Sequence, residues 1–290
     1  MKKEEKLSHI FIIVNNSIEK SDICAFCTNV NIAEPEIRFT YQYYDTNVNE
    51  DLYNLFINCD EPKEELLIIS DSQEIADMSV SEGIACVGLY SSSNRHSVIT
   101  GVLYCIEDLQ YMDFDRVYKM WQRFHKIPWT ITNTERLIIR EQTTEDIDAL
   151  YEIYSDPEIS RYTENLYSDR DEEYQYMVDY INNQYKYHEY GIWALVEKET
   201  GNLVGRAGLS LRPGCEDLEL GFVIGKKYQR KGYAYESCKA IIEYAFENLY
   251  SDRITAYTHV QNISSKNLLK KLGFMGNTYN EMCAFSLTKQ

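Results

Sequence analysis

In the N-terminal half of the chain, short apolar runs alternate with amphipathic segments. Four runs have the length and composition of buried strands, at Ile10–Val14, Leu66–Ser70, Ile84–Tyr90 and Val102–Ile106. Apolar residues at helical spacing lie between the second and third runs, over residues 72–81, and Gly83 follows as a helix terminator. Short apolar strands that alternate with helices are typical of a parallel sheet in an α/β domain.

The C-terminal half has a longer series of elements. A capping-box-like start at Thr143–Asp146 opens one helix, and others are predicted over 171–187, Tyr233–Leu249 and Ser264–Leu272. Strands are predicted at Arg136–Glu141, Ile192–Lys198, Leu203–Leu211, Leu218–Ile224, Ile254–Val260 and near Cys283–Leu287. This order predicts a mixed twisted sheet with flanking helices, in which three connections are antiparallel and one is a right-handed crossover.

The two halves meet near residues 128–134. Residues 113–127 have apolar side chains at helical spacing, and Pro128 follows them directly. Proline ends helices and pushes the residue before it into extended geometry. We therefore predict two domains, over 1–130 and 134–290. The fold class is α/β (α+β), with a Rossmann-like N-terminal domain.

Composition narrows the class of protein. The chain has 290 residues, enough for two domains, and its 44% hydrophobic and 26% charged residues are typical of a soluble globular protein. A net charge of −17 argues against non-specific binding to nucleic acid or to an anionic membrane. No apolar run approaches the ~20 residues that span a bilayer, and the N-terminus is a poor signal peptide, so a cytoplasmic location is expected.

The cysteines do not form a recognisable metal set. Eight of them are scattered through both halves, and Cys24 and Cys27 form one C-x-x-C pair. No second pair and no His-x-His completes a zinc site. We interpret them as reduced structural thiols and expect no metal.

The strand at Leu218–Ile224 runs into a basic loop that opens the longest helix. Residues 226–231 contain three lysines and one arginine in a chain that is otherwise strongly acidic. The first turn of a helix has free backbone N–H groups and a partial positive charge, and Gly232 permits close approach of a ligand. This segment predicts a site for a phosphate-bearing ligand. The alternative is an ordinary loop with a solvated basic face.

The loop lacks the spacing of a Walker A motif and of a dinucleotide fingerprint. It resembles the acyl-CoA diphosphate loop of the GNAT acetyltransferase superfamily, Gln/Arg-x-x-Gly-x-Gly/Ala, through Gln229, Gly232 and Ala234. Residues 262–265 and 270–274 resemble the Asn-x-x-Ser and Lys-Leu-Gly-Phe elements that end the cofactor region of that family. The opening 134–140 is similar to the start of the Rim-type branch, which includes ribosomal-protein N-terminal acetyltransferases. The resemblance covers roughly 134–290.

The resemblance implies a binding mode for acetyl-CoA, the acyl donor. The strand at Leu218–Ile224 would part from Ile254–Val260, the pantetheine arm would lie in the gap, and the diphosphate would sit on the amides of residues 230–234. The residues that the resemblance assigns to acetyl-CoA are Phe222, Val223, Ile224, Gln229, Arg230, Lys231, Gly232, Tyr233, Ala234, Asn262 and Ser265.

The family resemblance also implies a reaction. A free amine attacks the thioester carbonyl, a backbone N–H holds the oxyanion, and coenzyme A leaves as a thiol. The amine must first lose its proton, and Glu219 is the candidate base, acting through water, because Rim-type members carry a Glu in this strand. The alternative is a Glu that faces solvent or that holds the charge of the acceptor. Residues 264–272 lack the tyrosine that many relatives use as general acid, and spacing does not select Tyr233 or Tyr235 instead.

The acceptor stays open at this point. A protein N-terminus and a small-molecule amine, such as a polyamine, an amino acid or an aminoglycoside-like compound, are both compatible with the sequence, and so is a homodimer. The alternative function is a non-catalytic acyl-CoA-binding or protein-interaction module.

The N-terminal half has a resemblance of its own. Residues 66–90 resemble the late part of haloacid-dehalogenase-like hydrolases, with Asp71 at the end of a strand. That family also needs a nucleophilic aspartate after its first strand, where this chain has Asn15 and Asn16. Asparagine cannot form an aspartyl-phosphate. We therefore predict a degenerate, non-catalytic domain.

Overall fold

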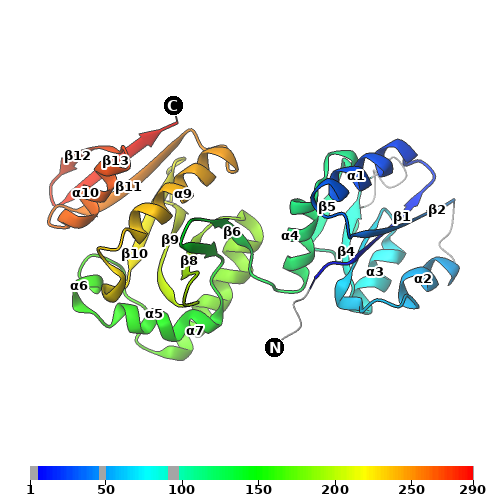
Figure 1. Cartoon of the computed structure of the whole chain (residues 1–290), viewed down its shortest axis with the longest axis horizontal. Coiled ribbons are helices and arrows are strands. Elements are labelled where there is room, and N and C mark those ends of the chain that lie inside the picture. Colours follow the sequence, from blue (N-terminus) through cyan, green and yellow to red (C-terminus); the bar gives the residue numbers. More distant parts are fainter. Residues whose placement is uncertain (1–5, 46–49, 91–97, 290) are drawn as a thin grey trace. The chain divides into compact units, whose positions relative to one another are not determined.

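The computed structural model describes residues 6–45, 50–90 and 98–289, and the chain divides into two compact units (Figure 1). The first unit contains residues 1–127 and the second residues 128–290. Pro128 thus begins the second unit, directly after the segment predicted as a helix. Each unit has its own sheet and its own core.

The N-terminal unit contains a parallel sheet, as predicted. Over the described residues its strand order is β2-β1-β3-β4-β5, and every neighbouring pair is parallel. The strands are β1 (His9–Asn15), β2 (Arg38–Tyr44), β3 (Leu66–Ser70), β4 (Ala85–Leu89) and β5 (Tyr104–Ile106). The helices are α1 (Lys20–Ala33), α2 (Glu50–Ile57), α3 (Gln73–Ser81) and α4 (Phe114–Phe124).

The apolar runs of this unit are continuous because its central strands are buried on both faces. Ile10, Ile12 and Val14 of β1 belong to one core cluster, and Phe11 and Ile13 belong to another. Burial of both faces removes the alternation of polar and apolar residues that a half-exposed strand shows.

Three elements of this unit were not predicted: α1, α2 and β2. The strand β2 lies at the edge of the sheet, and its residues are exposed or half-buried, so that its sequence has no apolar run. In α1 only Ile23, Phe26 and Val30 are buried, and the polar residues between them weaken the helical pattern.

His9 is a titratable group in the buried part of β1. Its side chain is 10% exposed, its Nδ1 lies 3.1 Å from Oε1 of Glu61, and its Nε2 lies 2.9 Å from Oγ1 of Thr40. Burial, and then the positive charge of Arg38, lower the pKa of His9 from its ordinary 6.5 to about 4. The imidazole is therefore neutral in the folded protein at neutral pH.

This shift predicts a pH dependence of stability. The unfolded chain binds a proton at His9 below its ordinary pKa, whereas the folded unit does not until about pH 4. The neutral imidazole therefore adds its full contribution to the free energy of unfolding above the ordinary pKa of histidine. As the pH falls from that value to about 4, this contribution, of up to about 3 kcal/mol, is lost. Urea unfolding of the full chain at a series of pH values measures this loss. Proteolytic cleavage within residues 6–45 reports the unfolding of the N-terminal unit. A His9→Gln variant is expected to show a smaller loss than the wild type between neutral and acidic pH, and equal losses would contradict the prediction.

The C-terminal unit contains a mixed sheet with helices on both faces. In the described residues the strand order is β12-β13-β11-β10-β9-β8-β7-β6. The strands are β6 (Thr130–Asn133), β7 (Leu137–Arg140), β8 (Ile192–Glu197), β9 (Leu203–Leu211), β10 (Leu218–Ile224), β11 (Arg253–His259), β12 (Met275–Tyr279) and β13 (Met282–Thr288). The helices are α5 (Ile147–Tyr154), α6 (Pro157–Ser160), α7 (Arg170–Tyr180), α8 (Lys186–His188), α9 (Tyr233–Glu247) and α10 (Ile263–Lys271).

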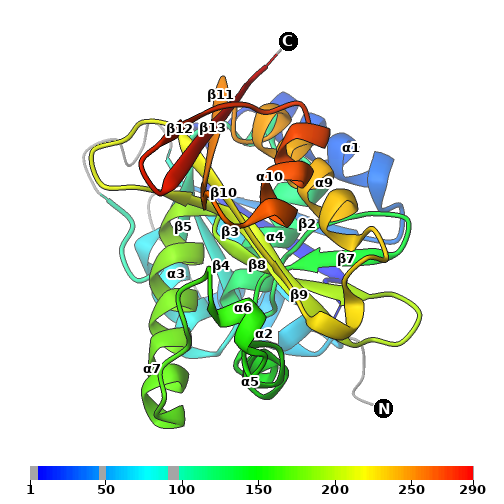
Figure 2. The ribbon, with the colours of Figure 1, turned by 90° about the vertical axis from the view of Figure 1, so that its left-hand side faces the viewer.

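The two faces of this sheet have different covers. Figure 2 shows α9 and α10 on one side of the strands and α5, α6 and α7 on the other. The core confirms the division, because Ile241 of α9 and Leu269 of α10 belong to one cluster, whereas Leu150 of α5 and Met177 of α7 belong to a second. We call the side of α5 to α7 the α5–α7 face and the side of α9 and α10 the α9–α10 face.

The strands β10 and β11 part, as predicted. β10 pairs with β9 over all seven of its residues, from Leu218 to Ile224. Its parallel pairing with β11 consists of Leu218 with Ile254 and Glu219 with Thr255. Beyond Glu219 the edge of β10 that faces β11 has no strand partner among the described residues, so the sheet is open toward the carboxyl ends of both strands.

Some predicted elements of this unit need correction. The long second helix is interrupted by a π-turn at residues 181–185, and α9 ends at Glu247 rather than at Leu249. The elements β6, α6 and β12 were not predicted. All five residues of β12 are exposed, so the strand has no apolar face for a sequence pattern to reveal.

Candidate functional site

A cavity of about 520 Å³ lies where β10 and β11 part. Its walls come from four segments that are distant in sequence. These are the α6 region (residues 158–163), the end of β10 (222–224), the loop and first turn of α9 (228–235), and α10 with its cap (262–271). The cavity is therefore bounded by elements from both faces of the sheet.

The structure brings the predicted cofactor residues together. Those that line the cavity are Phe222, Val223, Ile224, Gln229, Arg230, Gly232, Tyr233, Ala234, Asn262 and Ser265. Lys231 is exposed and is not among the lining residues. Its Nζ lies 5.4 Å from the ring centroid of Tyr228, which does line the cavity.

The start of α9 presents backbone N–H groups to the cavity. Gly232 is the N-cap, with φ of +93°, and the first bond inside the helix runs from the N–H of Glu236 to the carbonyl of Gly232, at 3.1 Å. The amides of Tyr233, Ala234 and Tyr235 therefore have no partner inside the helix. Arg230 also has a positive φ, of 64°, which turns the loop toward the helix. Such a turn is suited to an anion.

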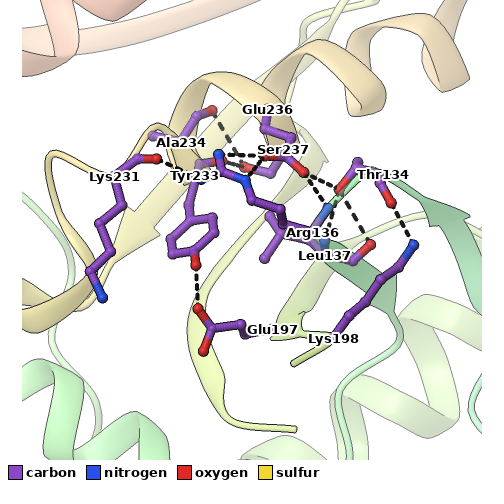
Figure 3. A network of polar contacts seen from close by, with 10 residues as sticks. All are labelled: Thr134, Arg136, Leu137, Glu197, Lys198, Lys231, Tyr233, Ala234, Glu236 and Ser237. Atoms are coloured by element: carbon purple, nitrogen blue, oxygen red, sulfur yellow. Dashed lines mark hydrogen bonds and ion pairs between the residues drawn. The ribbon is translucent and has the colours of Figure 1, made fainter. Parts of the chain in front are cut away.

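A polar network holds this helix start in place (Figure 3). Glu236 accepts hydrogen bonds from the Thr134 hydroxyl, at 2.6 Å, and from the backbone and Nε of Arg136, both at 2.8 Å. Arg136 also donates from Nη1 to the carbonyl of Lys231, at 2.9 Å. Burial alone would raise the pKa of Glu236, but the bonds from Thr134 and Arg136 outweigh it, and the pKa is lowered. The loop before α9 is thus fixed to the segment that precedes β7.

The hydroxyl of Tyr233 is engaged away from the cavity. It donates to the carboxylate of Glu197 at the end of β8 (Figure 3). This hydrogen bond, together with burial, raises the pKa of Tyr233. The neighbouring Tyr235 lines the cavity, with the Nζ of Lys271 at 4.4 Å from its ring centroid. The sequence did not distinguish Tyr233 from Tyr235 as the candidate general acid. In the structure the hydroxyl of Tyr233 is bound to Glu197, and that of Tyr235 is not.

Glu219 lies at the last residue pair that joins β10 to β11, outside the cavity-lining set. Its side chain is 15% exposed, and both carboxylate oxygens accept from Arg212, with Nη2 at 2.9 Å from Oε1. The guanidinium of Arg212 stacks on the ring of Tyr257 at 4.1 Å. The carboxylate is thus fixed at the closed end of the gap.

The cofactor residues that the family resemblance assigns do not include the wall formed by the α6 region. Lys226 pairs with Glu158, and Lys227 pairs with Glu152 at 2.7 Å, so two of the four predicted loop cations are already neutralised. In the described part of the chain, Arg230 and Lys231 are the loop cations without an ion pair. The local signal for this wall was weak, because it depends on contacts between residues more than sixty positions apart.

Two kinds of feature are absent from the described residues. No group of three or more His, Cys, Asp or Glu side chains there is arranged to hold a metal ion. No helix in those ranges is long and apolar enough to cross a membrane.

Residues 136–275 match the family described as the acetyltransferase (GNAT) domain. The chain is 30% identical over 142 residues to the uncharacterized N-acetyltransferase p20 of Bacillus licheniformis, which is 49% of this chain and 80% of that relative. It is 28% identical over 164 residues to the ribosomal protein uS5-alanine N-acetyltransferase of Escherichia coli K12, which is 53% of this chain and 82% of that relative. The chain is also similar to a solved acetyltransferase from Agrobacterium tumefaciens, with 23% sequence identity and a TM-score of 0.48. The match covers 55% of this chain and 94% of the Agrobacterium chain.

Proposed function

The chain belongs to the GNAT acetyltransferase family through its C-terminal unit, and from that premise we propose that it transfers the acetyl group of acetyl-CoA to a primary amine. The single observation that carries this proposal is the cavity between parted strands that ends on the first turn of α9. Acetyl-CoA would supply the activated acetyl thioester, as it does throughout the family.

The residues that are present fit this donor. The open edge of β10 offers backbone N–H and C=O groups to an amide-containing arm, as a neighbouring strand would. The amides of Tyr233, Ala234 and Tyr235 and the loop cations Arg230 and Lys231 would hold the diphosphate. Gly232 has a φ of +93°, which residues with a Cβ rarely adopt, so a glycine is needed to form this helix start. Asn262 and Ser265 would contact the donor from the start of α10.

Glu219 is the proposed base. Its carboxylate would take the proton of the acceptor ammonium through a water molecule, because an ammonium has no lone pair with which to attack. The nitrogen would then bond to the acetyl carbon as the carbon–sulfur bond breaks, and the departing thiolate would take the second proton that the nitrogen loses, so that coenzyme A leaves as its thiol. A backbone N–H on the open edge of β10 would hold the developing negative charge on the carbonyl oxygen.

The acceptor is proposed to be a primary amine on a protein N-terminus or on a small molecule. The name of the Escherichia coli relative, an alanine N-acetyltransferase of ribosomal protein uS5, favours the first. The alternative is a non-catalytic acyl-CoA-binding or interaction module. It is supported by the position of Glu219, because the carboxylate is paired with Arg212 and lies outside the cavity-lining set.

One experiment separates these functions. The full chain is mixed with acetyl-CoA and a panel of primary amines, free thiol is followed, and acetyl-CoA binding is measured by calorimetry. Binding with amine-dependent release of thiol supports the transferase, and binding without release for any amine supports the module. A chain that neither binds nor releases would exclude both.

For the N-terminal unit, the proposed role is that of a degenerate haloacid-dehalogenase-like domain without catalysis. Asp71, at the end of β3, is 4% exposed, and its Oδ1 accepts from the backbone N–H of Asn15, at 2.9 Å, and from the hydroxyl of Tyr44, at 2.8 Å. The position beside it that a phosphatase would need as a nucleophile is therefore an asparagine. Release of phosphate from p-nitrophenyl phosphate in the presence of Mg²⁺ would overturn this assignment.

A further inference from the structure

Arg206 is a cation that stands apart from the other arginines of the C-terminal unit. Five of them form ion pairs with carboxylates: Arg136, Arg140, Arg170, Arg212 and Arg253. Arg161 and Arg230 are exposed, whereas Arg206 is half-buried. Within the described ranges, no carboxylate lies within ion-pair distance of its guanidinium. A half-buried guanidinium without a direct ion pair is uncommon in a protein with a net charge of −17, and here Glu173 and Glu164 act on Tyr154 beside it without pairing with it.

The position of Arg206 relates it to the cavity. It lies on β9 directly opposite Val223 of β10, and side chains opposite each other in an antiparallel pair share a face. Val223 lines the cavity and packs with the cluster of α5 and α7, which places Arg206 on the α5–α7 face, behind Val223 and outside the cavity-lining set. Glu219 is on the same face of β10, four residues before Val223, or about 13 Å along the strand.

One nitrogen of the Arg206 guanidinium donates a hydrogen bond within the protein, and the other two are available to a ligand. Its Nε donates to the hydroxyl of Tyr154, at 2.9 Å, and its Cζ lies 4.8 Å from the centroid of that ring. Tyr176 is close by, since the charge of Arg206 opposes the effect of burial, which raises the pKa of Tyr176. No acceptor in the described residues takes a hydrogen bond from Nη1 or Nη2. These two groups form the planar fork that matches a carboxylate or carbonyl oxygen.

We propose that Arg206 binds a carbonyl or carboxylate oxygen next to the acceptor amine, and so makes the acetyltransferase selective for amines that carry such an oxygen. This inference rests on the proposed function. An α-amino carbonyl compound places its oxygen toward Arg206 while its nitrogen points toward Glu219 and the open edge of β10. A polyamine would place a second cation against the guanidinium instead, which electrostatic repulsion disfavours.

The test uses acceptors that are matched in shape. Alaninamide and isopropylamine differ in whether a carboxamide or a methyl group stands beside the amine-bearing carbon, and alanine and spermidine extend the comparison to a carboxylate and a polyamine. The ratio of kcat/KM for alaninamide to that for isopropylamine is measured with the full chain by thiol release. In an Arg206→Met variant this ratio is expected to fall by about tenfold or more, through KM for alaninamide, because a hydrogen bond to a charged group is lost.

Two variants control for structure. Arg206→Lys keeps the charge without the fork, and an intermediate ratio is expected. Arg253→Met makes the same chemical change at an exposed arginine that pairs with Asp217 at the start of β11, and the wild-type ratio is expected. The dissociation constant of acetyl-CoA should stay the same in all three variants, which separates an acceptor role from a general loss of packing.

Binding of the same four compounds is also followed by saturation-transfer NMR in the presence of coenzyme A, so that the inference does not depend on turnover. Arg206-dependent binding of alaninamide or alanine without any thiol release would support the inference and sink the proposed transfer. Equal use of isopropylamine or spermidine, with the same loss for every amine in Arg206→Met, would overturn the inference and leave the transfer standing. If neither alaninamide nor alanine binds, the inference is wrong.

Discussion

Replacement of Glu219 by glutamine is expected to lower kcat for amine-dependent thiol release by about a hundredfold or more, with acetyl-CoA affinity unchanged. Glutamine has nearly the shape of glutamate and can still bond to Arg212, but it cannot take a proton. The deprotonation of the acceptor would then depend on water alone. Stopped-flow or steady-state thiol detection gives kcat, and calorimetry gives the dissociation constant of acetyl-CoA.

The chain offers a matched control two residues away. Asp217 also pairs with an arginine, with Oδ2 at 2.8 Å from Nε of Arg253, and precedes β10. Asp217→Asn therefore removes one negative charge next to the same strand, as Glu219→Gln does. Wild-type turnover is expected for this variant. Normal turnover by Glu219→Gln would remove Glu219 from the chemistry and leave it a role in holding Arg212.

Replacement of Gly232 by valine is expected to weaken acetyl-CoA binding by at least about thirtyfold, through the loss of one or two hydrogen bonds to a charged group. A β-branched residue is strongly disfavoured at a φ of +93°, and its Cβ would meet the guanidinium of Arg136 at 3.2 Å. The loop is held by Arg136 and Glu236, so the strain is relieved by moving the amides that follow. Calorimetry with acetyl-CoA on the full chain measures the effect.

Gly83 provides the control for backbone strain. It also has a positive φ, of +74°, but no atom lies within 4 Å of its ideal Cβ, and it belongs to the N-terminal unit. Gly83→Val should therefore leave acetyl-CoA binding intact while circular dichroism verifies that both variants fold. Wild-type affinity in Gly232→Val would mean that the diphosphate does not rest on this helix start.

Elements with a strong apolar period could be predicted from the sequence, and exposed ones could not. β10 and β3 were predicted to the residue, because their apolar runs end at turn-forming or polar residues. β12 was missed because its five residues are exposed and its pairing partner, β13, supplies the buried positions. The same holds for β2 at the edge of the other sheet.

The site divides along similar lines. The helix start at Gly232 is a local feature, with a strand before it and a helix after it, and a sequence pattern of a few residues predicts it. The wall opposite is tertiary, since nothing near Lys226 in the sequence indicates that Glu158 is its partner. Glu219 was selected as a candidate base by family resemblance, but its pairing with Arg212 follows from the geometry of the β9–β10 turn and was not predicted.

The two-residue pairing of β10 with β11 has a consequence for the lifetime of the protein. If acetyl-CoA lies along the open edge of β10 as proposed, it supplies the hydrogen bonds that the sheet lacks there, so the ligand is a structural member as well as a reactant. A ligand at a hundred times its dissociation constant adds about 2.7 kcal/mol to the folded state. Resistance of the C-terminal unit to heat and to proteolysis would then rise with the concentration of acetyl-CoA.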